Sequence, residues 1–165
     1  MFLLFSCLFF YLTYLNIGEI MKIDFIDDDN LIVYYISDES FDNEKYIQLF
    51  IKMLDKKLRK QYDYDFRGYY NVDIYRSGNT NILEFERESD YGKADFDITV
   101  YLNSTILFEF EDEDYYKGNK LFFNNKYYVS SDMVDERIDL FEFGDIIYGK
   151  EALHIVDCGV PICKK

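Results

Sequence analysis

Histidine, cysteine and basic side chains are scarce in this chain of 165 residues, and each shortage excludes a class of function. The single histidine, His154, cannot recruit a second imidazole, which excludes most histidine-based metal sites. The three cysteines are Cys7, Cys158 and Cys163, a spacing that gives neither a disulfide framework nor a paired CxxC zinc site. A reducing compartment is the simplest setting for such a chain.

Lysine and arginine together number 18, against 32 aspartate and glutamate residues, so the net charge is −14. Repulsion from phosphate argues against binding to nucleic acid or to an anionic membrane, because both require cationic patches. Acidic surfaces suit basic partner proteins and, more rarely, inhibitors that mimic DNA by charge. Catalytic motifs are missing as well, since the sequence contains no GxSxG, phosphate-loop or GxGxxG pattern. We therefore expect no enzyme, no catalytic residue, no cofactor and no metal, and a role in binding proteins.

Aromatic side chains are abundant, with 17 tyrosines and 16 phenylalanines but no tryptophan. A genome biased toward A+T codons explains much of this, and an aromatic binding face is the functional alternative. The hydrophobic fraction of 49% supplies enough apolar surface for a core, so we expect a folded chain.

The first 20 residues form an apolar leader. Residues 1–15 are almost wholly apolar, but this run is shorter than a membrane-spanning helix needs and has no basic region before it. Met21 begins a plausible cytosolic domain, and the codons for Gly18 and Glu19 can form a purine-rich ribosome-binding run. We interpret 1–20 as upstream DNA translated in an over-long reading frame and expect a cytoplasmic protein. A membrane anchor through residues 1–16 is the alternative.

Periodicity predicts an α+β fold of two small units, in which antiparallel β-hairpins pack on helices. The first unit, residues 21–90, reads as ββαββ: a hairpin over 23–35, a helix over 42–60 and a hairpin over 70–85. In the helix, Asp42 is a candidate cap, and apolar residues recur at helical spacing. The members of that apolar stripe are Ile47, Phe50, Ile51, Leu54 and Leu58.

The second unit, residues 95–165, reads as β-ββ-α-α after a short connector over 88–94. It begins with a strand over 96–102 and contains a hairpin over 121–129 that turns at Asn124 and Asn125. A helix over 133–148 and a short helix over 151–157 follow, with Gly144 as a weak point in the first of them. Residues 106–110 have strand propensity, and residues 111–114 read as an acidic loop.

Carboxylates are densest just after that predicted strand. A calcium loop would need a regular Asp-x-Asp-x-Asn-Gly spacing with a distal Glu, and the cluster does not have it. We therefore interpret it as solvated charge that a partner protein could use. Tyrosines beside carboxylates could hold partners rich in Arg and Lys by stacking and charge. The members of the cluster are Glu109, Glu111, Asp112, Glu113 and Asp114.

Several short stretches, taken in order over residues 21–162, resemble the MecA-type adaptor proteins. Residues 119–129 resemble that family's aromatic β-hairpin, and Phe141-Glu142-Phe143-Gly144-Asp145 is similar to its Glu-Phe-Gly-acidic stretch. Residues 151–153 and 159–162 are similar to its closing helix and Gly-x-x-Ile ending. At the other end, residues 21–26, 30–33 and 67–72 resemble its opening hairpin and a later strand.

This resemblance implies a non-enzymatic adaptor of low-G+C Gram-positive bacteria. In that family the N-terminal domain captures a substrate protein, and the C-terminal domain docks on a Clp-type AAA+ unfoldase for proteolysis, as in the regulation of competence. The alternatives are an acidic anti-regulator that mimics DNA, or a domain that binds another protein. The chain departs from the family in its short connector and in 103–113, where the family has a helix. The candidate interface residues are Glu109, Glu111, Asp112, Glu113, Tyr127, Tyr128, Glu142 and Phe143.

Overall fold

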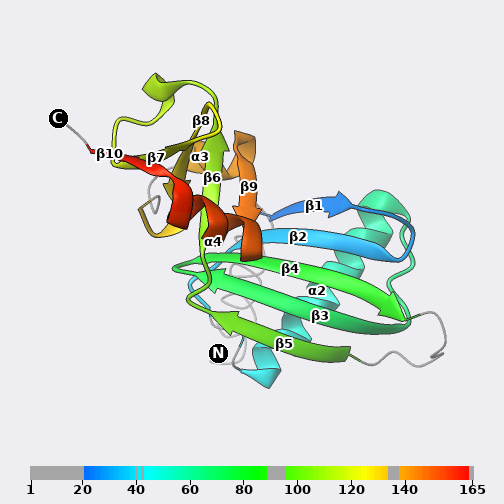
Figure 1. Ribbon diagram of the computed structural model, residues 1–165. Coiled ribbons are helices and arrows are strands. Elements are labelled where there is room, and N and C mark those ends of the chain that lie inside the picture. The colour runs from blue at the N-terminus through cyan, green and yellow to red at the C-terminus, as the bar shows by residue number, and fades with distance from the viewer. Residues whose placement is uncertain (1–20, 40, 42, 89–95, 134–137, 164–165) are drawn as a thin grey trace, which may run out of the picture.

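A computed structural model describes residues 21–39, 41, 43–88, 96–133 and 138–163 (Figure 1). The α+β class is confirmed, because helices pack on two five-stranded sheets in which most neighbouring strands are antiparallel. The predicted leader and residues 89–94 of the predicted connector over 88–94 lie outside the described residues, and Glu88 is the last residue of a strand. In the described part of the chain, no helix is long and apolar enough to cross a membrane.

The first sheet has the strand order β1-β2-β4-β3-β5. The two predicted hairpins supply its first four strands, and they are antiparallel because each pair is joined by a tight turn. In the first turn the Asp27 carboxylate accepts hydrogen bonds from the backbone of Asp29 and Asn30, both at 2.8 Å. The strands are β1 (Met21–Phe25), β2 (Asn30–Ile36), β3 (Tyr69–Ser77), β4 (Thr80–Glu88) and β5 (Phe96–Leu102).

Helix α2 (Glu44–Tyr62) covers one face of this sheet, with Phe50, Leu54 and Leu58 buried against it. The helix begins at Glu44, two residues later than predicted, and its cap is Asn43, whose Oδ1 accepts from the Lys45 backbone N–H at 3.0 Å. Asn and Asp are equivalent caps, so composition alone could not choose between neighbours. Asp42 itself lies outside the described residues.

Strand β5 lies in the first sheet, although the sequence assigned it to the second unit. It pairs with β3 in parallel, with Tyr70 opposite Phe96 and Arg76 opposite Leu102. Ile98 and Val100 pack against the same core as α2. An alternating apolar pattern defines the buried face of a strand but does not say which sheet the strand joins. The first sheet is therefore larger than the predicted ββαββ unit.

The second sheet has the strand order β10-β7-β8-β6-β9, and all its neighbours are antiparallel. The predicted hairpin turn is confirmed: Asn124 and Asn125 adopt φ values of 47° and 62°, which asparagine tolerates in two-residue turns. The strands are β6 (Ile106–Phe110), β7 (Lys120–Phe123), β8 (Lys126–Ser130), β9 (Asp145–Tyr148) and β10 (Val160–Ile162). The acidic loop contains a 3₁₀ turn, η1 (Glu113–Tyr115), and a second turn, η2 (Ser131–Met133), follows β8.

The single helix predicted over 133–148 is wrong. Helix α3 (Ile138–Phe143) is followed directly by Gly144, whose N–H donates to the Leu140 carbonyl at 2.8 Å, and the chain continues as β9. A Cβ at Gly144 would lie 2.6 Å from the Leu140 carbonyl oxygen, so only glycine fits this sharp exit. The predicted closing helix is confirmed as α4 (Gly149–Cys158).

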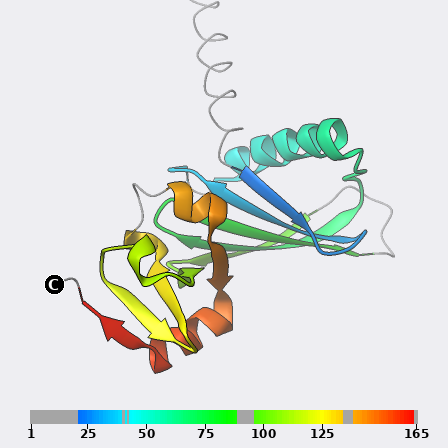
Figure 2. The ribbon, with the colours of Figure 1, turned by 90° about the horizontal axis from the view of Figure 1, so that it is seen from above.

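The two sheets stack, with α2 on the outside of one and α4 on the outside of the other (Figure 2). Strand β6 explains this arrangement, because alternate side chains enter different cores. Phe108 packs toward Tyr34 and Ile82 of the first sheet, whereas Leu107 packs against α4. The Tyr148 hydroxyl of the second sheet donates to Glu84 of the first, and the Ser77 hydroxyl of the first sheet donates to Asp132 of η2, both at 2.5 Å.

Candidate functional site

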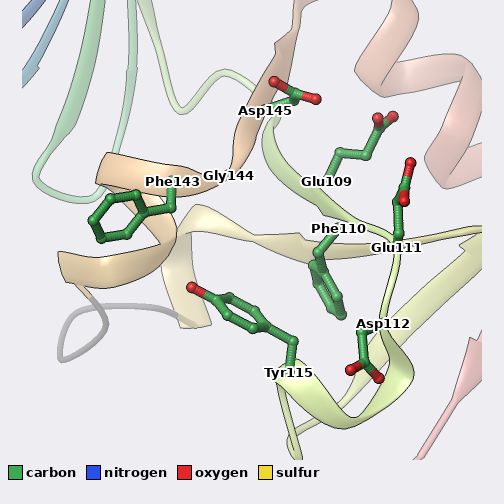
Figure 3. A pocket seen from close by; sticks show the side chains of 8 residues that line it. All are labelled: Glu109, Phe110, Glu111, Asp112, Tyr115, Phe143, Gly144 and Asp145. Carbon is green, nitrogen blue, oxygen red and sulfur yellow. The ribbon is translucent and has the colours of Figure 1, made fainter.

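A pocket of about 360 Å³ lies where β6 runs into the acidic loop and α3 meets β9 (Figure 3). We call it the acidic–aromatic pocket. Four carboxylates and three aromatic rings line it, together with Gly144. The lining residues are Glu109, Phe110, Glu111, Asp112, Tyr115, Phe143, Gly144 and Asp145.

Strand pairing creates this pocket by placing the end of β6 beside the start of β9. Glu109 is directly opposite Asp145 in the antiparallel ladder. Phe143 and Gly144 immediately precede Asp145, so the α3–β9 junction forms one wall of the pocket. The other wall comes from β6 and η1, and the Tyr115 hydroxyl points toward the Phe143 side (Figure 3).

Glu109 is held in the pocket wall by two side chains of the same chain. Its side chain is only 11% exposed, and it forms an ion pair with Lys126 while accepting a hydrogen bond from the Tyr128 hydroxyl at 2.8 Å. The hydrogen bond and charge of Glu109 raise the pKa of the Lys126 ammonium, and the charges of Asp145 and Glu111 act in the same direction. Both oxygens of Glu109 are therefore occupied by this chain's own donors.

The other three carboxylates of the pocket, Glu111, Asp112 and Asp145, are exposed. Asp112 caps η1 through its Oδ1, which accepts from the Asp114 backbone N–H at 2.8 Å. That bond fixes the loop and leaves the second oxygen of Asp112 available to a ligand. Among the described residues, the pocket is thus lined by exposed negative charge that Lys126, paired with Glu109, only partly offsets.

The three rings differ in how firmly they are held. Phe110 is buried, with its ring centroid 6.0 Å from that of Tyr115 and 5.9 Å from that of Tyr127. Phe143, at the end of α3, is 78% exposed. An exposed phenylalanine that shares a pocket with other rings and carboxylates is the kind of surface that protein interfaces use.

The predicted interface residues divide into those in the pocket and those outside it. Glu109, Glu111, Asp112 and Phe143 line it. Tyr128 is buried under α4, and its hydroxyl donates a hydrogen bond to Glu109. Tyr127 lies between Phe110 and Phe122, and its hydroxyl donates to Glu113 at 3.4 Å. Glu142 belongs to α3, but its side chain lies outside the described set.

Phe110, Tyr115 and Asp145 also line the pocket, and sequence reasoning did not select them. In the sequence Phe110 has the pattern of a buried strand residue. It is indeed buried, and it lines the pocket as well. Asp145 was placed inside a helix, where it would have pointed elsewhere. Its position directly after Gly144 was the signal that could have identified it, because glycine ends helices.

The carboxylates and rings of the pocket are groups that a cationic side chain can contact. Within the described ranges, no group of three or more His, Cys, Asp or Glu side chains is placed to hold a metal ion. The Cys158 Sγ and the His154 Nδ1 lie 3.7 Å apart on the exposed surface of α4, and neither residue lines this pocket. Aromatic faces with carboxylates nearby attract ammonium and guanidinium groups.

Replacing Glu109 with leucine should lower the free energy of unfolding by about 1–3 kcal/mol, because the buried Tyr128 hydroxyl loses its acceptor. Chemical denaturation with urea measures this difference. Glu111→Leu is the matched control, since Glu111 is exposed, and it should change stability by less than about 0.5 kcal/mol. Equal effects of the two substitutions would contradict the structural role of Glu109.

No family model, curated protein or solved structure matches this chain. The resemblance to the MecA-type adaptors therefore stays a prediction.

Proposed function

We propose that this chain is a non-enzymatic adaptor that binds a partner protein by receiving one of its Arg or Lys side chains in the acidic–aromatic pocket. The observation that carries the proposal is the exposed Phe143 ring, which lines the same pocket as three exposed carboxylates. Exposed carboxylates that lie outside any pocket are explained by solubility alone. Carboxylates that share a pocket with three rings offer both charge and stacking to a single guanidinium or ammonium group.

The energetics favour a basic side chain as the ligand. A cation over an aromatic ring gains about 0.5–2 kcal/mol, depending on how far it is desolvated. Charge-assisted hydrogen bonds to Glu111, Asp112 or Asp145 would add direction. The net charge of −14 would also speed the encounter with a basic partner.

The resemblance to MecA-type adaptors supplies the specific form of the proposal: the partner is a Clp-type AAA+ unfoldase, and a substrate protein is the cargo. In the family the C-terminal domain docks on the unfoldase, and the acidic–aromatic pocket lies in the C-terminal half of this chain. On this reading the pocket contacts the unfoldase.

Phe143→Ala should weaken partner binding about 30-fold, which corresponds to the roughly 2 kcal/mol of an aromatic hot-spot residue. The test is a pull-down from a lysate of a low-G+C Gram-positive bacterium with the tagged full chain as bait. Mass spectrometry identifies the captured proteins, and calorimetry then measures the dissociation constant for each variant. Phe143 is exposed, so the substitution should leave the fold unchanged.

Leu49→Ala is the matched control, because Leu49 is another exposed apolar side chain but lies on α2. Capture that does not depend on Phe143 would overturn the pocket proposal. Capture of a different protein that does depend on Phe143 would keep the pocket and overturn the Clp assignment. Binding should also weaken as salt is added, because exposed charges are screened.

A further inference from the structure

A second hollow, a groove of about 480 Å³, lies on the α4 side of the second sheet. It is separate from the acidic–aromatic pocket, and the two share no lining residue. Its apolar lining comes from Leu107, Leu121 and Tyr128 of the sheet, Val156 of α4, and Pro161 and Ile162 of β10. The other lining residues are Thr105, Asn119, Lys120, Ser130 and Cys163.

Exposed apolar side chains extend from the groove along α4 and β10. Leu153 is 52% exposed, Val156 is 45% exposed and Val160 is 62% exposed. Leu153 and Val156 are three residues apart on the same helix, so they form one ridge beside the groove. A groove with an apolar ridge beside it is a surface that water solvates poorly.

The described lining of the groove offers an occupant no free charge. Among the described residues that line it, Lys120 is the one with a charge, and its ammonium donates to the backbone carbonyls of Glu113 at 2.5 Å and Tyr116 at 2.8 Å. An occupant that placed a charge there would lose hydration without gaining a partner. The groove therefore selects an apolar surface, in contrast to the acidic–aromatic pocket.

The edge strand β10 indicates what kind of segment can bind. Pro161 is its central residue and has no N–H, so the outer edge of this three-residue strand is a poor template for an added strand. A small molecule inside the groove would leave Leu153 and Val160 in water. A second copy of this chain would bring another net charge of −14 against the first. A helix laid over the groove avoids all three difficulties.

We propose that the groove docks an amphipathic helix of a partner protein, which inserts aliphatic side chains between α4 and β10. Such helices present apolar anchors at positions i, i+3 or i+4, and i+7. This site does not depend on the proposed ligand of the acidic–aromatic pocket. The pocket borders β9 and the groove borders β10, which are opposite edges of the second sheet, so one chain could hold two partners at once.

The test is a selection from a phage library of helical peptides with randomised side chains, using the full chain as the target. Enriched peptides should carry apolar residues at helical spacing. Their affinity, measured by fluorescence anisotropy, should fall at least tenfold for Val156→Asp, which places a charge in the groove. Val160→Lys should act in the same direction from the other side of the groove. Circular dichroism verifies that both variants are folded.

Ile26→Asp is the matched control, because Ile26 is 62% exposed in the β1–β2 turn, which belongs to the first sheet. It should leave the affinity of the peptides unchanged. The proposal is overturned if enriched peptides have an alternating strand pattern or bind Val156→Asp as tightly as the parent chain. A dimer of the parent chain that dissociates in Val156→Asp would also overturn it, because the occupant would then be a second copy. Phe143→Ala should retain peptide binding, which separates this site from the acidic–aromatic pocket.

Discussion

Raising the pH from 10 to 12 should unfold this protein. Several tyrosines are packed in the cores or between the sheets, and burial is the main cause that raises the pKa of each hydroxyl. The pKa of Tyr34 rises to about 12 through burial and through the charges of Asp24 and Glu84. The pKa of Tyr75 also rises to about 12, through burial and then the charge of Glu84. The others whose pKa is raised in this way are Tyr46, Tyr70, Tyr128 and Tyr148.

The sign of the effect follows from proton binding. In the unfolded chain these hydroxyls ionise near pH 10, whereas in the folded chain they stay protonated to higher pH. The folded state therefore holds more protons over this interval, and stability falls as the pH rises. Below pH 10 the contribution is fully present. For Tyr34, which is only 8% exposed, a rise of the pKa from 10 to about 12 corresponds to about 2–3 kcal/mol.

The melting temperature, followed by circular dichroism, should fall steeply between pH 10 and 12, together with the appearance of tyrosinate absorbance. Tyr34→Phe should retain more stability in this interval than the parent chain, because one of the shifted hydroxyls is gone. Tyr62→Phe is the control, since its ring is 48% exposed. If tyrosinate absorbance developed fully while the protein kept its fold, the buried hydroxyls would not control stability at high pH.

Local patterns predicted the helix and the hairpins well. The apolar stripe of α2 and the two asparagines between β7 and β8 act within a few residues, where periodicity and turn chemistry decide the structure. Strand β5 was found at its correct residues but placed in the wrong sheet. Its pairing with β3 joins residues that are distant in the sequence, and the alternating pattern of residues 96–102 does not reveal that neighbour.

The acidic–aromatic pocket was predicted only in part, for the same reason. The acidic cluster and Phe143 were both selected, but their meeting depends on the pairing of Glu109 with Asp145 across 36 residues. The different roles of the carboxylates were also hidden in the sequence. Glu109 and Glu111 are two residues apart, yet one is held by Lys126 and Tyr128 and the other is exposed.

Phe108→Ala should lower the free energy of unfolding by about 3–5 kcal/mol, the usual cost of removing a buried phenylalanine side chain. Phe108 is 2% exposed at the centre of β6, with its ring centroid 6.4 Å from that of Phe141. Phe143→Ala is a matched control for the same change of residue type, because Phe143 is 78% exposed and should lose less than about 0.5 kcal/mol. Urea denaturation measures both.

The shape of that unfolding curve also tests how the two sheets are coupled. The core around Phe108 includes Tyr34 and Ile82 of the first sheet, so we expect Phe108→Ala to destabilise the whole chain in a single transition. Two independent units, divided as the sequence suggested near residues 90–95, would instead show two transitions, only one of them shifted. A single shifted transition would mean that the acidic–aromatic pocket and the apolar groove are held by a scaffold to which both sheets contribute. Binding at either site would then stabilise the first sheet as well as the second.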